Sequence, residues 1–248
     1  MSTATKKTAL ITDSTRSIGL ALAEYYTKNG WNVIGTARAN SNTDEVAALS
    51  PFKIVMLDTS DEASILEAAR QLEGVPIDLL INNAGIWVPD DFQAATKDAF
   101  MRQFEVNAVS PFLVTRALLL NLELAAKTNE SAYVTQISSL VGSIGSNTTE
   151  TKDFFSKAYG YTASKAALNM VTRSLAVGLR ASNIGFVTLH PGYVATDMNG
   201  HQGYMEPSES AEAMAKIVAN LSLEDTGKFF NADDQYPVYE LPWEQGVT

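Results

Sequence analysis

The chain has 248 residues, of which 46% are hydrophobic and 19% charged, a composition that is ordinary for a globular protein and excludes a disordered one. Its 28 acidic residues outnumber 18 basic ones, and the net charge of −10 disfavours binding to nucleic acid or to an anionic membrane. The sequence has no cysteine and only two histidines, which excludes disulfides, thiolate metal sites and multi-histidine metal sites, so we expect no metal.

Short apolar runs alternate with helical patterns along the chain. A first strand at 8–12 is followed by a helical face from Ile18 to Tyr25, which ends at the stop signal Asn29-Gly30. Strands that are apolar throughout and separated by helices predict an α/β fold, a doubly wound Rossmann-type domain with a mainly parallel sheet covered on both faces. The other expected strands are 32–36, 53–57, 77–81, 132–137 and 185–189, and the expected helices are 61–73, 96–126, 158–182 and 208–221.

The start of the chain and its most apolar stretch bear on location. Residues 1–7 contain too few apolar side chains for a signal peptide, and no cysteine demands an oxidising compartment, so the sequence predicts a cytoplasmic protein. Residues 111–126 are the most apolar stretch, but Arg116, Asn121 and Glu123 interrupt it. We therefore do not expect this stretch to cross a bilayer.

Polar residues and glycines follow every predicted strand. In doubly wound sheets, ligands bind beyond the carboxyl ends of the strands, near the point where the strand order reverses. Turn formation alone explains part of this pattern. The pattern also predicts a ligand site at that edge of the sheet. The residues after the strands are 13–19, Ala37 and Arg38, Asp58, 82–85, Ser138 and Ser139, and 190–192.

The loop Thr12–Gly19 has the layout of a strand, a tight turn and a helix start that presents backbone N–H groups to a pyrophosphate. Only Gly19 stands where a glycine is wanted, so an ordinary turn is the alternative. Arg38 follows the second strand, and no acidic residue occurs from 25 to 43, which favours a 2′-phosphate over a free 2′-hydroxyl. Arg16 and Arg38 would then form a cationic clamp, unless Arg38 is merely a surface residue.

Tyr161 and Lys165 carry the strongest chemical signal. On a helix, positions i and i+4 share a face, and a neighbouring ammonium is expected to lower the phenol pKa from ~10, which suits proton exchange with a carbonyl oxygen. Such spacing also occurs by chance, but Ser139 at the end of the preceding strand offers a hydroxyl for the same oxygen. Asn107 lies in a helical window that disfavours asparagine, so we expect it to organise a local distortion and a water reaching the lysine.

Taken together, these motifs resemble the short-chain dehydrogenase/reductase family, in particular its carbonyl-reductase branch that includes sniffer and C-factor proteins. The resemblance covers essentially the whole chain and implies one domain over 1–248, with a dinucleotide half at about 7–130 and a catalytic and substrate half at about 131–243. The segments that carry it are 12–19, Asp58, 82–85, Asn107, 137–139, Tyr161 with Lys165, and 190–198, while 142–148 and the ending Leu241-Pro242-Trp243 indicate the branch.

The resemblance implies an NADPH-dependent oxidoreductase. Tyr161 would be the acid in carbonyl reduction, Lys165 would lower its pKa and bind the nicotinamide ribose, and Ser139 would hold the substrate oxygen. Asn107 would link Lys165 to a proton-relay water. The expected NADP(H)-binding residues are Ser14, Arg16, Ser17, Ile18, Arg38, Asp58, Asn83, Ala84, Gly85, Tyr161, Lys165, Pro191, Gly192, Val194 and Thr196. Asp58 would accept a bond from the adenine amino group, its alternative role being a helix cap.

Two positions depart from the family pattern, because Asp13 and Ser17 stand where it has glycines. Aspartate tolerates left-handed backbone, so the turn is expected to survive, but its charge would oppose a phosphate. Arg16 was the expected partner that would partly neutralise Asp13. The alternative function is therefore a degenerate family member with weakened or lost dinucleotide binding that acts as a regulatory or binding protein.

The residues expected near the substrate are mainly apolar or aromatic, which suits a hydrophobic aldehyde, ketone or quinone. The segment 199–207 reads as a mobile lid in which His201 is solvated, and His190 reads as structural. The polar run at 146–158 would cover the pocket entrance or obstruct subunit contacts, and the family resemblance makes a homodimer the expected assembly. The expected substrate residues are Trp87, Leu140, Tyr193, Met198 and Tyr204.

Overall fold

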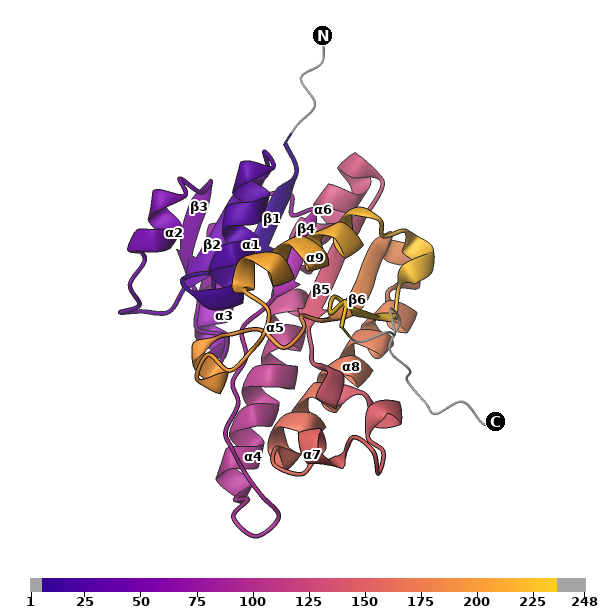
Figure 1. Ribbon diagram of the computed structural model, residues 1–248. Helices are drawn as coiled ribbons and strands as arrows, with labels where there is room; N and C mark the ends of the chain where they lie inside the picture. Colours follow the sequence, from indigo (N-terminus) through magenta and orange to yellow (C-terminus); the bar gives the residue numbers. More distant parts are fainter. Residues whose placement is uncertain (1–5, 236–248) are drawn as a thin grey trace.

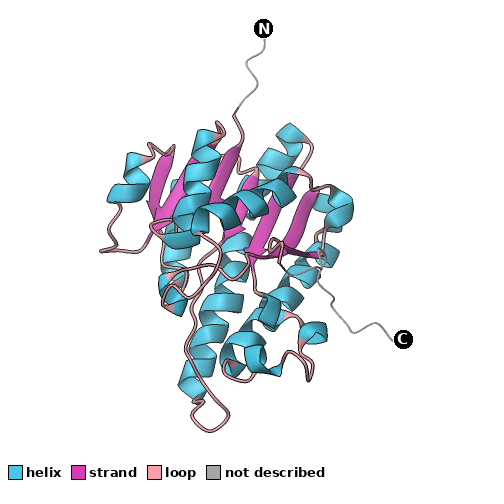
Figure 2. Cartoon of the chain, in the orientation of Figure 1, coloured by secondary structure: helices cyan, strands magenta, loops and turns pink. Residues whose placement is uncertain are grey.

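The computed structural model describes residues 6–235, so the 241–243 ending and the last part of the predicted 131–243 half lie outside the described residues. Its strands form one parallel sheet in the order β3-β2-β1-β4-β5-β6-β7 (Figures 1 and 2). The order reverses between β1 and β4, which confirms the predicted doubly wound sheet. The strands are β1 (Thr8–Ile11), β2 (Asn32–Ala37), β3 (Lys53–Met56), β4 (Leu79–Asn82), β5 (Ala132–Ile137), β6 (Ile184–His190) and β7 (Phe229–Asn231).

Helices cover both faces of the sheet, as Figure 2 shows. The α-helices are α1 (Ser17–Lys28), α2 (Asp44–Ala48), α3 (Glu62–Gln71), α4 (Lys97–Phe104), α5 (Ser110–Ala117), α6 (Leu119–Asn129), α7 (Lys152–Phe155), α8 (Tyr159–Gly178) and α9 (Pro207–Ala219). A π-helical segment, η1 (Glu105–Val109), joins α4 to α5. Short 3-10 segments are η2 (Leu140–Gly142), η3 (Ile144–Ser146), η4 (Arg180–Ser182), η5 (Asp197–Asn199) and η6 (Leu223–Asp225).

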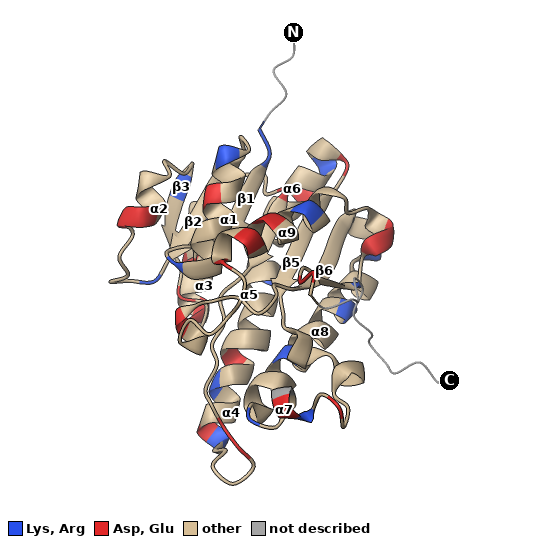
Figure 3. Cartoon of the chain, in the orientation of Figure 1, with Lys and Arg blue, Asp and Glu red and all other residues tan. Residues whose placement is uncertain are grey.

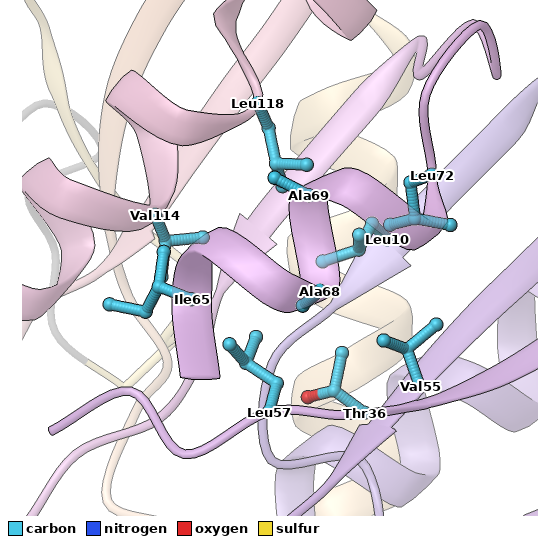
Figure 4. Close-up of a pocket in the computed structure, with 10 residues that line it drawn as sticks. All are labelled: Leu10, Thr36, Val55, Leu57, Ile65, Ala68, Ala69, Leu72, Val114 and Leu118. Atoms are coloured by element: carbon cyan, nitrogen blue, oxygen red, sulfur yellow. The ribbon is translucent and has the colours of Figure 1, made fainter. Parts of the chain in front are cut away.

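Two apolar cores lie on opposite faces of the sheet. Helices α1, α2 and α9 pack on one face, where Leu22 and Met214 are almost fully buried. Helices α3, α5, α6 and α8 pack on the other, around residues such as Leu122 and Phe186. A cavity of about 10 Å³ lies within this second core. Figure 4 shows the residues that line it, which are Leu10, Thr36, Val55, Leu57, Ile65, Ala68, Ala69, Leu72, Val114 and Leu118. Because that volume is about one water molecule and the lining is almost entirely apolar, the cavity is a packing gap and not a ligand site.

The sequence prediction differs from the structure mainly in the helix expected at 96–126. That window holds α4, η1, α5 and most of α6, and the axis bends by 59° between α5 and α6. The expected local distortion at Asn107 is present, since this residue lies in the π-helical segment. Strand β7 and the short helices α2 and α7 were not predicted, because three to five residues carry too little periodicity to be recognised.

Within residues 6–235, no single helix is long and apolar enough to span a bilayer, although Lys97–Ala117 and Leu119–Asn129 meet the criterion together as a bent pair. In the same part of the chain, no group of three or more histidine, aspartate or glutamate side chains gathers at a potential metal site. Figure 3 shows acidic and basic segments interspersed along the same helices.

Candidate active site

The loop after β1 keeps the left-handed turns that its two substitutions put in question. Asp13 has φ of 52° and Ser17 has φ of 46°, so both non-glycine residues adopt the conformation that glycine favours. Gly19 is required here for another reason, because a Cβ atom on it would lie 2.1 Å from the carbonyl oxygen of Asp13. The expectation that the turn survives is therefore correct.

The residues that follow β4 hold that loop in place. The Asn83 side-chain amide donates to the carbonyl oxygens of Thr12 at 3.0 Å and Asp13 at 3.2 Å. The Thr12 hydroxyl accepts the backbone N–H groups of Asn83 and Ala84, both at 2.9 Å. Asn83 and Ala84, which are predicted cofactor-binding residues, thus stabilise the loop after β1.

The N-terminus of α1 is open to an anion. Arg16 is its N-cap residue, no side chain caps the helix, and its first turn holds no acidic residue. Ser17 and Ile18 begin the helix and are partly exposed. The first N–H groups of a helix and its dipole attract negative charge, so this end suits a phosphate.

Ser14, one of the predicted cofactor residues, bonds to the neighbouring strand β2. Its side chain is fully buried, and its hydroxyl both donates to the carbonyl oxygen of Thr36 at 3.1 Å and accepts the N–H of Thr36 at 2.8 Å. Its own N–H also donates to the Thr36 carbonyl oxygen. A Cβ on Gly35 would lie 2.8 Å from the Ser14 hydroxyl, so the serine packs closely against β2 and joins this strand to the loop.

Arg16 pairs with a different carboxylate from the expected one. Its guanidinium lies 3.6 Å from the Asp197 carboxylate, in the loop after β6, and not against Asp13. Asp197 also lies 3.1 Å from the exposed imidazole of His201. Both pairs are more than half exposed, so each contributes little to stability and leaves Arg16 able to turn toward a phosphate.

A groove of about 530 Å³ lies beyond the ends of β2 and β3, lined by Arg38, Asp58 and seven neighbouring residues. Arg38 is exposed at its rim. The Asp58 carboxylate accepts bonds from the backbone and hydroxyl of Ser60, which with the nearby Arg38 hold its pKa below the usual value despite some burial. The α3 cap is Asp61, which accepts the N–H of Ala63, so the helix-cap alternative for Asp58 is wrong.

Ser139, Tyr161 and Lys165 come together where the carboxyl end of β5 meets the first turns of α8. A side-chain hydrogen bond joins Ser139 to Tyr161, and the Lys165 ammonium lies 5.7 Å from the centre of the Tyr161 ring. Lys165 is 4% exposed and donates to the carbonyl oxygen of Ile137 at 2.7 Å. A Cβ on Gly85 would lie 3.3 Å from the Asn107 amide oxygen and 3.5 Å from the lysine nitrogen, so Gly85 packs closely against both side chains.

The electrostatics of this group differ from the expectation. Burial raises the pKa of Tyr161 to about 12, and the hydrogen bond with Ser139 offsets only part of the rise. Burial also lowers the pKa of Lys165 to about 8. The predicted lowering of the phenol pKa by the lysine is therefore wrong for this structure. Desolvation dominates, and the phenol is protonated at neutral pH.

Asn107 is fully buried and connects several elements around Lys165. Its amide nitrogen donates to the Ile86 carbonyl oxygen and to the Ser164 hydroxyl, both at 2.9 Å, and its amide oxygen accepts the Ile86 N–H at 2.8 Å. Ser164 in turn donates to the carbonyl oxygen of Tyr161 at 2.8 Å. Ser164 was not predicted, although its place one turn after Tyr161 on the same helix is a sequence signal that points to it.

The helix that carries Tyr161 and Lys165 is fixed from a distant loop. The buried Asp90 carboxylate accepts the N–H of Tyr159 at 2.6 Å and of Gly160 at 2.8 Å, and so caps the start of α8. A carboxylate at a helix N-terminus also interacts favourably with the dipole. Asp90 was not predicted, because a cap supplied from about 70 residues away leaves no local pattern in the sequence.

The loop between β6 and α9 supplies most of the remaining predicted site residues. Thr196 caps η5 by accepting the Asn199 N–H, which leaves its hydroxyl proton available, and Gly192 has φ of 93°. Two further predicted cofactor residues lie in this loop. The carbonyl oxygen of Pro191 accepts a hydrogen bond from the Ser210 hydroxyl, and Val194 is buried. The predicted substrate residues Tyr193, Met198 and Tyr204 are exposed, whereas Trp87 and Leu140 are partly exposed. His190 is buried, as expected for a structural residue.

The predicted lid is anchored along part of its length. Val194 pairs with Met205 in a parallel bridge, and the N–H of Ala195 donates to the carbonyl oxygen of Met205 at 2.9 Å. A Cβ on Gly203 would lie 2.2 Å from the Ala195 nitrogen, so the two limbs of the loop are in close contact.

Comparisons with known proteins agree with this geometry. The family model described as short chain dehydrogenase matches residues 7–207. The C-signal protein of Myxococcus xanthus is 36% identical over 172 residues, which cover 68% of this chain and 93% of that protein. The NADPH-bound carbonyl reductase from chicken fatty liver is 34% identical, with a TM-score of 0.83 over 92% of this chain and 96% of that one. The Sniffer carbonyl reductase of D. melanogaster is 28% identical, with a TM-score of 0.86 over 96% and 100%.

Proposed function

We propose that this chain, which belongs to the short-chain dehydrogenase family, reduces a carbonyl compound to an alcohol with NADPH as the hydride donor. The observation that carries the proposal is the convergence of Ser139, Tyr161 and Lys165 at one edge of the sheet. The NADPH-bound carbonyl reductase at 34% identity supports the choice of reaction and cofactor. The apolar and aromatic side chains nearby favour a hydrophobic aldehyde, ketone or quinone.

Each of the three side chains has a distinct task in this reaction. The Ser139 hydroxyl binds and polarises the substrate oxygen, and the Tyr161 hydroxyl donates its proton to that oxygen. The raised pKa of Tyr161 keeps the proton on the phenol until the substrate oxygen becomes strongly basic. The Lys165 charge stabilises the phenolate that remains, and Asn107 and Ser164 hold the helix that carries both residues. The bound dihydronicotinamide supplies the hydride.

The residues present fit NADPH with one exception. The uncapped N-terminus of α1 suits the pyrophosphate, Arg38 and Arg16 suit the 2′-phosphate, and the Lys165 ammonium suits the hydroxyls of the nicotinamide ribose. Asp13 is the exception, because its carboxylate shares the loop with the phosphate site. This charge favours the second candidate, a family member with weakened dinucleotide binding that serves as a regulatory or binding protein.

Two measurements on the wild-type chain separate the candidates. NADPH fluorescence is titrated first, and then the loss of NADPH absorbance is followed with aromatic aldehydes, aliphatic aldehydes, ketones and quinones. Binding and turnover together support the reductase. Failure to bind at about millimolar cofactor would eliminate it and favour the regulatory alternative.

The rate of carbonyl reduction is expected to depend on pH through Lys165. Its pKa of about 8 means that the ammonium charge is present below that value and is lost as the pH rises through it. We expect kcat to be constant around neutral pH and to fall above about pH 8, with Tyr161 still protonated. Lys165→Arg keeps its charge at all these values, so its profile should lack the fall. A wild-type rate that stays level well above pH 8 would contradict the role of the lysine.

Arg38→Ala is expected to weaken NADPH binding by roughly 10- to 100-fold while leaving NADH binding nearly unchanged, because hydrogen bonds to a charged group contribute about 1.5–3 kcal/mol. Dissociation constants for both cofactors measure the effect. Arg180→Ala is the matched control, since it removes an equal charge from η4, after α8. An unchanged preference for NADPH over NADH in Arg38→Ala would refute the cofactor assignment.

We extend the proposal to a cytoplasmic location, which the sequence predicts, and to a homodimer, which the family resemblance implies. Exposed apolar side chains on α4, η1, α5 and α8 support pairing through these helices. They are Met101, Val109, Phe112, Met170 and Val177.

A further inference from the structure

A buried carboxylate lies behind the aromatic residues of the β6–α9 loop. Asp233 follows β7 and is 6% exposed. Its carboxylate accepts a hydrogen bond from the Tyr204 hydroxyl and another from the N–H of Gln235 at 3.0 Å. Asp233 is also fixed through its backbone, because its N–H donates to the Asn231 side chain at 2.9 Å. The acceptor is thus held rigidly, whereas Tyr204 belongs to a loop.

The bond from Tyr204 is strongly favoured by its surroundings. Burial lowers the pKa of nearby His190 to about 4, so this imidazole is neutral and offers no positive charge to Asp233. A buried carboxylate that loses one of its donors is destabilised, because water does not replace the lost bond. Burial, together with the hydrogen bond to Asp233 and the charge of that carboxylate, raises the pKa of the Tyr204 phenol, which therefore stays protonated and able to donate.

Anchoring Tyr204 also fixes its neighbour. The Tyr193 and Tyr204 rings meet edge to face with their centres 5.8 Å apart, and the N–H of Tyr204 donates to the Tyr193 carbonyl oxygen at 3.0 Å. Both rings remain about half exposed, at 45% and 50%. Their edge-to-face contact is a favourable aromatic geometry that depends on the orientation of each ring.

The ring pair lies at the edge of the sheet that carries the proposed chemistry. Strands β5, β6 and β7 are adjacent and parallel, and β5 and β6 lie side by side in Figure 1. Ser139, Tyr193 and Asp233 each follow the carboxyl end of one of these strands. Because these strands are neighbours, we expect the ring pair to contact the organic group of a substrate whose oxygen Ser139 binds.

We propose that Asp233 is a positioning residue that holds the Tyr193–Tyr204 ring pair in place and so gives the site a preference for aromatic carbonyl compounds over small aliphatic ones. The specificity part rests on the proposed reductase function. The anchoring part does not, because it concerns contacts within the chain.

The test uses three variants of the full chain. Tyr204→Phe keeps the ring and removes only the bond to Asp233, Asp233→Ala removes the acceptor, and Asp233→Asn retains an acceptor oxygen and should rescue. Tyr133→Phe is the matched control, since it removes a hydroxyl bonded to the Leu221 carbonyl oxygen, near the start of β5 and far from its Ser139 end. Circular dichroism verifies that each variant is folded.

Hydrogen–deuterium exchange without cofactor measures the anchoring. We expect amides of 193–205 to exchange about 10-fold faster in Tyr204→Phe and Asp233→Ala, with Asp233→Asn and Tyr133→Phe close to wild type. Steady-state kinetics with benzaldehyde and propanal measure the specificity. We expect KM for benzaldehyde to rise roughly 10-fold in the two unanchored variants, with kcat and the propanal KM changed less than about twofold.

Each outcome bears on a definite part of the proposal. Unchanged exchange in both unanchored variants overturns the anchoring, whatever the activity. Equal KM increases for both aldehydes, or none, overturn the specificity role while the reductase function stands. A wild-type chain that reduces neither aldehyde nor any other carbonyl removes the proposed function, and with it the specificity role, and the exchange result then decides the anchoring alone.

Discussion

Tyr161→Phe is expected to lower kcat for carbonyl reduction by roughly 10²- to 10⁴-fold, the range that general acid catalysis supplies. The change removes one oxygen atom and keeps the ring, so the packing of the start of α8 is retained. Without that hydroxyl, Ser139 still binds the substrate oxygen, but the phenol proton that is donated to this oxygen is lost. NADPH affinity should change less than about threefold, because Lys165 and the phosphate loop are untouched.

Tyr159→Phe provides the matched control. Tyr159 begins the same helix, is 39% exposed, and contacts the edge of the Phe92 ring. Loss of its hydroxyl should leave kcat within about twofold of wild type. If Tyr161→Phe retained more than about a tenth of the wild-type kcat, the phenol would not be the proton donor.

Asp13→Asn is expected to tighten NADPH binding by about 5- to 200-fold. A carboxylate ~5 Å from a phosphate costs about 1–3 kcal/mol at effective dielectric constants of ~80 to ~20. Asparagine removes the charge and tolerates left-handed backbone, so the φ of 52° at this position is kept without new strain. The structure strengthens this prediction, because Arg16 pairs with Asp197 and leaves Asp13 without the expected neutralising partner. Isothermal titration of both proteins measures the difference.

Ser17→Gly separates charge from backbone conformation. Ser17 has φ of 46°, a left-handed backbone conformation like that of Asp13. Glycine adopts this conformation without strain, so the Ser17→Gly change relieves backbone strain but changes no charge. Its effect on the NADPH dissociation constant should stay within about threefold, and Asp13→Gly should match Asp13→Asn. Equal affinity in wild type and Asp13→Asn would show that the carboxylate points away from the phosphate and that the charge argument is wrong.

The parts of the site that were predictable share a local origin. The i,i+4 spacing of Tyr161 and Lys165 fixes their common helix face, and an asparagine in a helical window signalled the distortion found at Asn107. Arg38 and Asp58 were placed by the rule that parallel strands end at one edge, and both line one groove there. Their functional roles stay predictions.

The parts that were not predictable depend on distant contacts. Asp90 caps α8 from a loop about 70 residues away, and Asp233 reaches Tyr204 from the next strand of the sheet. Ser14 was placed with the cofactor because it sits in the loop after β1, but packing against Gly35 and Thr36 turns it inward. No periodicity or spacing in the chain encodes such partners.

By itself, the sequence determined the alternating strands and helices, the sheet edge at which polar groups collect, and the shared face of the phenol and the amine, since each follows from backbone geometry repeated over a few residues. The tertiary structure alone decided which protonation state those groups prefer. Desolvation depends on everything packed around a side chain, and here it raises the pKa of Tyr161 and lowers that of Lys165, opposite to the direction that their pairing suggested for the tyrosine. It also decided which carboxylate each cation and hydroxyl finds, because such choices are made between residues that only folding brings together.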